Sequence, residues 1–247
     1  MNLKEYKYYL DMHCHYDELS LDQIKNINED IISVSASVDF NSYKRLEKIK
    51  KNNFKNMYFA YGLYPDQILE KTLKECYEDL DNMDFSNAIA VGEIGLDNKI
   101  TKDKVKREEQ KKLFEKQLSI AKEINKPVVI HTRYATKSTL EILTAWKDLK
   151  IILHWFAGNE KEIITALDRG YYLTQRFASP IIQNPKEYLD QLFIETDFPV
   201  PFRGETIIPN DIKLSYNEFC KQYNLDLDEL KKITTNNFLK LFPSLNV

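Results

Sequence analysis

The four histidines of this 247-residue chain are its side chains best suited to chemistry, and each follows a short apolar run. They are His13, His15, His131 and His154. Two carboxylates, Glu93 and Asp197, occupy comparable places at the ends of apolar runs. Imidazole nitrogens and carboxylate oxygens bind divalent cations, and a pair of such cations suits hydrolysis. The six residues therefore predict one shared metal site.

Each of these residues also has a purely structural interpretation. A lone histidine at a strand end is commonly a hydrogen-bonded structural residue. Glu93 alone could cap a helix or form a salt bridge, and Asp197 alone could be a turn residue before Pro199. The His-x-His pair favours metal binding, because alternate side chains on a strand point the same way. That the chain has no other histidine favours it further.

Eight short runs rich in β-branched, leucine and aromatic residues must position these ligands. We expect strands at residues 8–15, 30–36, 57–63, 88–95, 127–132, 150–156, 171–176 and 192–197. Most are continuously apolar, which is typical of buried parallel strands. With helical patterns between them, they predict a single-domain (β/α)8 barrel of the TIM type over residues 1–247. Active sites of such barrels lie at the carboxyl ends of the strands, where all six candidate ligands fall.

Apolar residues at helical spacing mark three of the expected helices. The buried faces are Tyr43, Leu46 and Ile49, then Leu113, Phe114, Leu118, Ala121 and Ile124, and lastly Leu230, Ile233, Phe238 and Leu241. Asp226 and Glu229 resemble a capping box before the last of these helices. Gly170 is expected to follow the carboxyl end of a helix, and residues 198–211 to form a loop over the barrel mouth.

Composition excludes several classes of protein. With 35 basic and 38 acidic residues, the net charge of −3 argues against a protein that coats nucleic acid electrostatically. Three widely spaced cysteines, Cys14, Cys76 and Cys220, indicate no disulfide framework and fit a cytoplasmic location. No run approaches the ~20 apolar residues that span a bilayer, so we expect no membrane association.

Several stretches, taken together, resemble the TatD family of metal-dependent deoxyribonucleases, within the amidohydrolase-like barrels. The stretches are residues 11–17, 62–65, 91–97, 110–121, 126–133, 154–158, 194–199 and 235–242. Each is weak alone, but their order and spacing cover nearly the whole chain.

The resemblance implies two divalent metal ions, with Zn²⁺ or Mn²⁺ better suited to the histidines than Mg²⁺. It assigns His13, His15 and Asp197 to one metal, His131 and His154 to the other, and Glu93 as the bridge. A water between the cations would attack phosphorus, and Asp197 would orient that water or move its proton. Arg133 would grip a phosphate, although an ordinary ion pair at the barrel mouth is an equally good interpretation.

The sequence also departs from the family pattern. Tyr64 stands where the family usually has histidine, so a neutral donor would contact the phosphate. Asn98 and Lys99 follow Asp97, where aromatic residues are common. Aromatic residues near the expected mouth could stack on unpaired bases: Tyr16, Tyr64, Trp155, Phe156, Phe177 and Phe198. Packing under loops is the competing interpretation, and we prefer it for Phe156.

The sequence therefore predicts a cytoplasmic two-metal phosphodiesterase that trims single-stranded DNA ends, with nucleic acid as its partner. A hydrolase of an amide or lactone is the first alternative. Such enzymes often bridge their metals with a modified lysine, and here Glu93 occupies the fourth strand end. A barrel that serves as a subunit of a multi-protein system, for example in anti-phage defence, is the second alternative.

Overall fold

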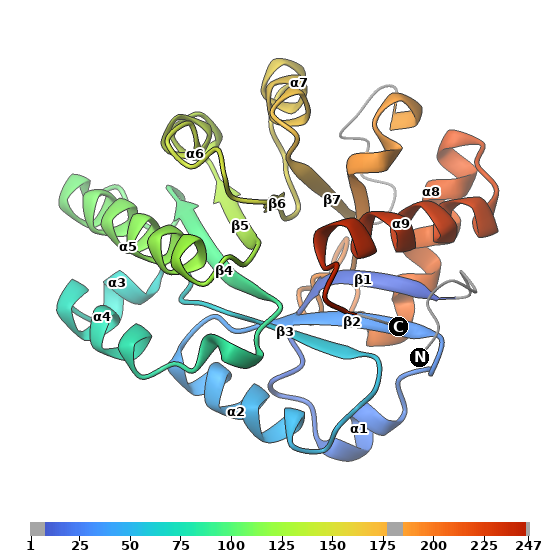
Figure 1. The fold of residues 1–247 in the computed structure, drawn as a ribbon, viewed down its shortest axis with the longest axis horizontal. Coiled ribbons are helices and arrows are strands. Elements are labelled where there is room, and N and C mark those ends of the chain that lie inside the picture. Colours follow the sequence, from blue (N-terminus) through green and yellow to red (C-terminus); the bar gives the residue numbers. More distant parts are fainter. Residues whose placement is uncertain (1–7, 177–184, 246–247) are drawn as a thin grey trace.

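Eight parallel strands form one sheet in sequence order, with helices around the outside (Figure 1). The computed structural model describes residues 8–176 and 185–245. The strands are β1 Tyr9–Cys14, β2 Ile31–Ala36, β3 Met57–Tyr61, β4 Ala90–Asp97, β5 Val128–Arg133, β6 Ile151–Leu153, β7 Tyr172–Arg176 and β8 Leu192–Glu195. All eight predicted strands are confirmed, although β6 ends three residues earlier than expected. The fold is the predicted (β/α)8 barrel.

The helices follow the strands as in a barrel of this type. They are α1 Leu21–Lys25, α2 Phe40–Lys50, α3 Gln67–Glu70, α4 Leu73–Asp81, α5 Lys104–Glu123, α6 Thr136–Leu143, α7 Glu160–Asp168, α8 Ile212–Tyr223 and α9 Leu227–Leu241. The described part of the β7–β8 connection holds only short 3-10 turns, where strict alternation predicts an α-helix. None of the described helices is both long and apolar enough to span a bilayer.

The predicted helix faces pack against the barrel, except that two of the predicted residues are only partly buried. Ile124 is the residue after α5 and is only partly buried, and Ile233 of α9 is also partly buried. Asp226 caps α9 through the backbone N–H groups of residues 228 and 229, but the reciprocal bond of a capping box is not among its described contacts. Gly170 follows α7 with a φ of 77°, as predicted for a residue beyond a helix end.

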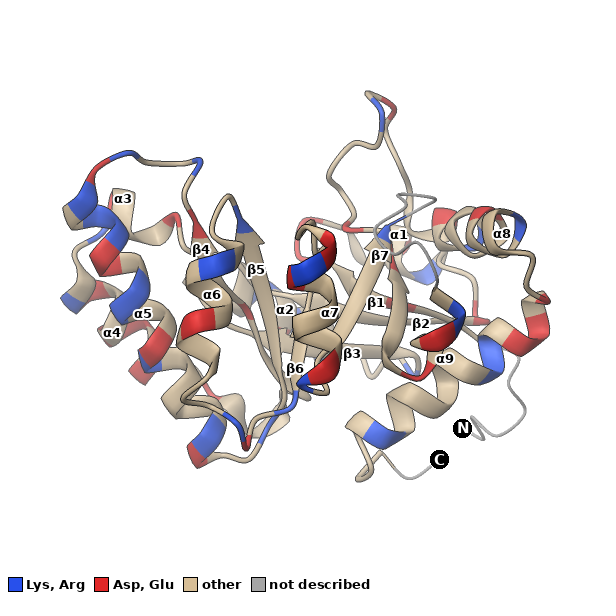
Figure 2. Cartoon of the chain, turned by 90° about the horizontal axis from the view of Figure 1, so that it is seen from above, with Lys and Arg blue, Asp and Glu red and all other residues tan. Residues whose placement is uncertain are grey.

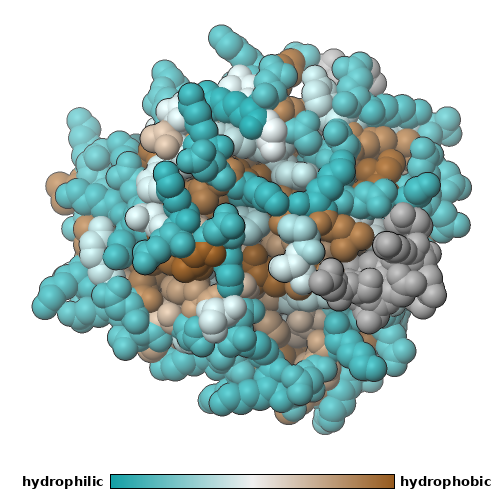
Figure 3. Space-filling view, in the orientation of Figure 1, coloured by the Kyte–Doolittle hydropathy of each residue, from teal (hydrophilic) through white to brown (hydrophobic). Residues whose placement is uncertain are grey.

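Two apolar layers separate the barrel axis from solvent. An inner cluster joins Met12, Val34, Val129 and other inward strand residues to Phe238 at the end of α9. A larger outer cluster lies between the strands and the helices. Acidic and basic residues lie interspersed on the outer helices (Figure 2). Hydrophilic side chains dominate the rim of the face seen in Figure 3. The three cysteines are buried free thiols.

The barrel closes between β8 and β1 partly through a buried carboxylate. Asp11 accepts a hydrogen bond from the Thr196 backbone N–H at 2.9 Å and another from its hydroxyl at 2.6 Å. Farther along, the Asp197 N–H donates to the His13 carbonyl at 2.9 Å. Burial raises the pKa of Asp11 to about 8, against the opposing effect of the Thr196 bonds. The side chain of Asp11 thus supplies bonds that strand pairing supplies elsewhere.

Replacing Asp11 should therefore weaken the barrel at this seam. Asp11→Ala leaves the buried N–H and hydroxyl of Thr196 without partners, so we expect a loss of about 2–5 kcal/mol in the free energy of unfolding. Asp11→Asn keeps an acceptor for the N–H and should cost less. Urea denaturation in EDTA measures both without any contribution from bound cations. A loss below about 1 kcal/mol for Asp11→Ala would contradict this role.

Candidate metal centre

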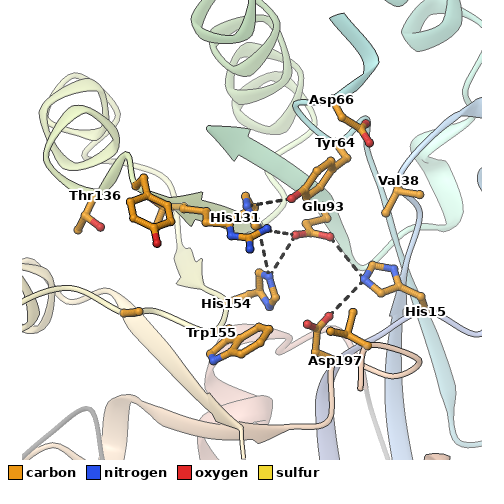
Figure 4. A pocket seen from close by; sticks show the side chains of 15 residues that line it. His15, Val38, Tyr64, Asp66, Glu93, His131, Thr136, His154, Trp155 and Asp197 are labelled. Atoms are coloured by element: carbon orange, nitrogen blue, oxygen red, sulfur yellow. Dashed lines mark hydrogen bonds and ion pairs between the residues drawn. The ribbon is translucent and has the colours of Figure 1, made fainter. Parts of the chain in front are cut away.

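The structure brings all six predicted ligands together at the carboxyl ends of the strands. Figure 4 shows His15, Glu93, His131, His154 and Asp197 around the cavity. His13 lies on β1, Glu93 on β4 and His131 on β5, while His15, His154 and Asp197 follow β1, β6 and β8 within two residues. Four of the six are buried, and the imidazoles of His15 and His131 are 12% and 13% exposed. The parallel barrel therefore gathers residues that are up to 184 positions apart in the sequence (Asp197 minus His13).

Two breaks in strand register turn ligands toward the barrel axis. The β1–β2 pairing shifts next to His13, and the β4–β5 pairing shifts between Val91 and Ile94. Val91 and Ile94 both pack in the outer apolar cluster, although strict alternation would place residues three apart on opposite faces. The shift between them therefore re-aims Glu93, as irregularities beside functional sites commonly do.

Gly95 lets β4 approach β5 beside the site. A Cβ atom at this position would lie 2.0 Å from the carbonyl oxygen of His131, and its φ of 140° disfavours any side chain. Gly95 and His131 are also direct register partners. The absence of a side chain at Gly95 therefore allows His131 to lie close to Glu93.

Gly95→Ala is expected to be far more damaging than alanine at another glycine with positive φ. Gly170 has a φ of 77°, but a Cβ atom there would meet nothing within 4 Å, so Gly170→Ala should cost about 1–2 kcal/mol from backbone strain alone. Gly95→Ala adds a backbone clash and should exceed about 3 kcal/mol or prevent folding. Denaturation midpoints and the soluble fraction compare the two. Equal losses would mean that the close approach is unimportant.

The two carboxylate oxygens of Glu93 face different groups of histidines. Glu93 Oε2 lies 3.5 Å from the Nε2 atoms of both His13 and His15. Glu93 Oε1 lies 3.0 Å from His131 Nδ1 and 3.1 Å from His154 Nε2. Figure 4 shows Glu93 between the groups that contain His131 and His15. A carboxylate placed in this way can serve two cations at once.

Asp197 adds an oxygen to the first of these groups. Its Oδ1 atom lies 3.6 Å from His13 Nε2 and 3.5 Å from His15 Nε2. The ligand atoms of His13, His15 and Asp197 all lie within 4.8 Å of one another, and so do those of His13, Glu93 and His154. His13 thus lies where it can contribute to either group.

Hydrogen bonds on the outer side of the rings fix which nitrogen faces the centre. His15 Nδ1 lies 3.0 Å from the Ala36 carbonyl oxygen, which can only accept, so Nδ1 carries the proton. His154 Nδ1 donates in the same way to the buried carboxylate of Glu195 at 3.2 Å. When His15 and His154 are deprotonated, their inner Nε2 atoms therefore present lone pairs, an arrangement typical of metal-binding histidines.

His131 is held by a tyrosine and a carboxylate. The Tyr64 hydroxyl donates to Asp97 Oδ2 at 3.1 Å, so its oxygen is left to accept from His131 Nε2 at 3.0 Å. Asp97 Oδ2 also lies 3.4 Å from the same nitrogen. The other ring nitrogen, Nδ1, then directs its lone pair at Glu93.

This donor set fits divalent cations. When the rings are neutral, lone pairs of His15, His131 and His154 point at carboxylate oxygens 3.0–3.5 Å away, so a cation or a proton must lie between the two acceptors. The buried Nδ1 of His13 has no hydrogen-bond partner among the described residues. Imidazole and carboxylate ligands together suit Zn²⁺ and Mn²⁺.

The electrostatics of the cluster keep its carboxylates ionised. Burial raises the pKa of Glu93, but the charge of His154 and the hydrogen bond from His13 outweigh burial and hold it well below the usual value. Burial likewise raises the pKa of Asp197, and the bond from His15 brings it below its usual value. For His15, burial lowers the pKa, but Asp197 and Glu93 raise it to about 9. The cluster therefore attracts positive charge.

The centre opens into a cavity of about 850 Å³. Tyr64 and Arg133, the two predicted substrate contacts, both line it. Arg133 is 48% exposed at the side chain, and its Nη1 lies 3.9 Å from Asp97 Oδ2, so the predicted ion pair at the mouth is present. Val200 of the predicted mouth loop also lines the cavity.

The predicted aromatic mouth is only partly present. Trp155 lines the cavity and is 36% exposed, and Tyr64 lines it as well. Tyr16 is fully buried, because its hydroxyl bonds Ser33 and its ring packs on Phe198, so its prediction as a mouth residue is wrong. Phe156 is fully buried, as preferred from the sequence. Phe177 lies outside the described residues.

Three neighbours of the site were not identified as functional from the sequence. Glu195 is the last residue of β8, just before Asp197, and Asp97 is the last residue of β4, shortly after Glu93. An acidic residue this close to a candidate ligand is a sequence signal for a carboxylate that hydrogen-bonds a ligand from the outer side. Tyr134 lines the cavity and is 76% exposed, but one tyrosine after an arginine gives no sequence signal.

The barrel and its donor set define a metal-dependent hydrolase of the (β/α)8 type. A family model described as TatD related DNase matches residues 10–243, so the chain belongs to this family. An uncharacterized metal-dependent hydrolase of Methanocaldococcus jannaschii is 26% identical over 95% of this chain and 96% of that protein. Human deoxyribonuclease TATDN3 is 28% identical over 74% of this chain and 71% of that protein. The crystal structure of YjjV, a TatD homolog from Escherichia coli, covers 96% of this chain and 99% of its own, with a TM-score of 0.81 and 24% identity.

Proposed function

We propose that the protein hydrolyses phosphodiester bonds of DNA with two divalent cations and trims single-stranded ends. The observation that carries this proposal is the bridging position of Glu93, which turns one oxygen to each group of histidines at 3.0–3.5 Å. Two cations held side by side suit the in-line displacement at phosphorus.

The chain's own residues would divide the binding of the cations. His13, His15 and Asp197 would hold one, His131 and His154 the other, and Glu93 both. When bound, such cations neutralise phosphate charge and make water more acidic. The outer bonds to Ala36, Glu195 and Tyr64 would keep the inner nitrogens deprotonated and in place.

Residues at the cavity would handle the substrate and its proton. Asp197 is ionised and borders the cavity, so it would accept the proton of the attacking water. The half-exposed guanidinium of Arg133 would contact a phosphate oxygen. The Tyr64 hydroxyl is engaged by Asp97 and His131, so we expect it to act on the substrate mainly through His131.

A DNA end is the substrate class that best fits these features. The near-balanced charge of the chain favours local recognition over a broad basic groove. The cavity volume is in the range of small-ligand pockets, which suits a terminal nucleotide better than a duplex. One relative is named a deoxyribonuclease, which supports DNA over other phosphodiesters.

A metal-by-substrate matrix tests the proposal. Purified metal-free protein is supplied with Mg²⁺, Mn²⁺ or Zn²⁺ and offered end-labelled single-stranded DNA, duplex DNA, RNA and a small amide or lactone. We expect stepwise shortening of single-stranded DNA with at least one cation and no cleavage in EDTA.

The alternatives give different patterns in the same matrix. Hydrolysis of the amide or lactone without any cleavage of DNA would favour an amidohydrolase. Inactivity on every substrate, despite stoichiometric metal, would favour a barrel that acts only with a partner protein. Internal cuts in duplex DNA would contradict the trimming of ends.

A further inference from the structure

Tyr134 is an exposed aromatic side chain at the mouth of the metal centre. It directly follows β5, which carries His131, and it lines the same cavity. At 76% exposure it is the most accessible of the large hydrophobic residues described. Leaving an aromatic ring in water gives up the free energy that its burial would release. The ring is therefore available to pack against a molecule bound in the cavity.

The backbone of Tyr134 also indicates a selected position. Its φ of 53° is left-handed, a conformation that glycine or asparagine adopts more readily than a bulky residue. A chain that needed only this turn would be served better by glycine. Left-handed bulky residues gather at functional sites, where the surrounding structure holds them.

Asn98 holds this conformation from the neighbouring strand end. Its side-chain amide donates to the Tyr134 carbonyl at 2.9 Å, and its backbone N–H donates to the Arg133 carbonyl at 2.9 Å. Two bonds from one residue therefore fix the peptide groups on both sides of the Tyr134 N–Cα bond. The backbone of Tyr134 is therefore held in place by hydrogen bonds, although its aromatic side chain is exposed.

Trp155 lines the same cavity from the next βα loop. It is 36% exposed, its φ is 36°, and its backbone N–H donates to Thr174 at 2.8 Å and to Glu195 at 2.9 Å. The guanidinium carbon of Arg176 lies 4.9 Å from its ring centre. The segments after β5 and β6 thus each carry an aromatic residue, Tyr134 or Trp155, whose backbone is left-handed and hydrogen-bonded. Each follows a histidine of the candidate metal centre closely in sequence.

We propose that Tyr134 is a base-binding residue that stacks on an unpaired nucleobase next to the scissile phosphate. The inference rests on the proposed function and names the part of the substrate that this side of the cavity recognises. Arg133 and Tyr134 both line the cavity, so a cation for phosphate and a ring for a base are available to the same bound nucleotide. Stacking is tolerant of sequence, because every base has an aromatic face.

Steady-state kinetics on single-stranded oligonucleotides tests this role. The fully metal-loaded protein is given an oligonucleotide in which one base at a time is replaced by hydrogen. For wild type, removing the base at one position should raise KM about tenfold, as expected for one lost stacking contact. Tyr134→Ala should raise KM about as much on the intact strand and should be insensitive to that base. Tyr134→Phe keeps the ring and should restore wild-type behaviour.

A spectroscopic readout separates stacking from a merely structural effect. The fluorescence of a 2-aminopurine base at the same position should be quenched when the oligonucleotide binds wild type or Tyr134→Phe. It should remain high when the oligonucleotide binds Tyr134→Ala. Tyr77→Ala is the matched control, since Tyr77 is a partly exposed tyrosine of α4 outside the cavity residues. Asn98→Ala should raise KM less than Tyr134→Ala and add nothing in the double variant.

The outcomes distinguish this inference from the proposed function. An unchanged KM and unchanged quenching in Tyr134→Ala, with wild type active on DNA, would overturn the base-binding role alone. A base effect that persists in Tyr134→Ala would also overturn it. If wild type neither binds nor cleaves any oligonucleotide, the proposed function fails first, and this role fails with it.

Discussion

Glu93→Gln is expected to lower turnover by well over 100-fold while the barrel remains folded. The substitution keeps the volume of the side chain but replaces one carboxylate oxygen with an NH₂ group, which donates and cannot bind a cation. Because each oxygen faces a different histidine group at 3.0–3.5 Å, one group must lose its shared ligand, and the other keeps only a neutral amide oxygen, so both cation sites are weakened. Loss of an outer-sphere partner already costs about 10–100-fold, so a direct ligand should cost more.

Metal analysis and kinetics together check this expectation. We expect the variant to retain its circular dichroism spectrum, to hold fewer cations per chain and to have lost nearly all turnover. Glu47→Gln is the matched control, because Glu47 is a partly buried carboxylate that accepts from Tyr61 at 2.5 Å on the outside of the barrel. Near wild-type turnover of Glu93→Gln with full metal content would show that another group bridges the cations.

The architecture was predictable because buried parallel strands leave a strong signature. The run before His131 is apolar over its whole length, since β5 is covered on both faces. Once eight such runs were recognised, the positions of the ligands followed, because every parallel strand in a barrel ends at the same rim. Sequence alone therefore placed His154 and Asp197 beside His13 and His15, which lie far earlier in the chain.

Details that depend on non-local contacts were not predictable. Nothing in the local sequence shows that the register shift beside Glu93 re-aims its side chain. Tyr16 was expected at the mouth, but bonds from its backbone and hydroxyl to serines of β2 draw it into the interior. The role of Tyr134 was not predictable, because its backbone is held by Asn98, a residue 36 positions earlier on another strand end.

Asp197→Asn should abolish turnover in a different way, by weakening only one of the two cation sites. Asp197 Oδ1 approaches His13 and His15 at 3.5–3.6 Å, and the described contacts place it with that group. Asparagine keeps one oxygen but loses the negative charge, so it binds cations weakly and cannot accept a proton from water. We expect a loss of more than about 100-fold in kcat, comparable to that of Glu93→Gln.

The metal content distinguishes the two variants even though both are inactive. Asp197→Asn should retain about one cation per chain, held by His131, His154 and Glu93, whereas Glu93→Gln should weaken both sites. Asp148→Asn, at an aspartate whose side chain is 82% exposed and is not among the residues that line the cavity, is the control and should match wild type in both measurements. Equal loss of both cations from Asp197→Asn would show that the sites form only as a pair. That result would also favour the alternative grouping in which His13 acts with Glu93 and His154, because His13 would then couple the two sites directly.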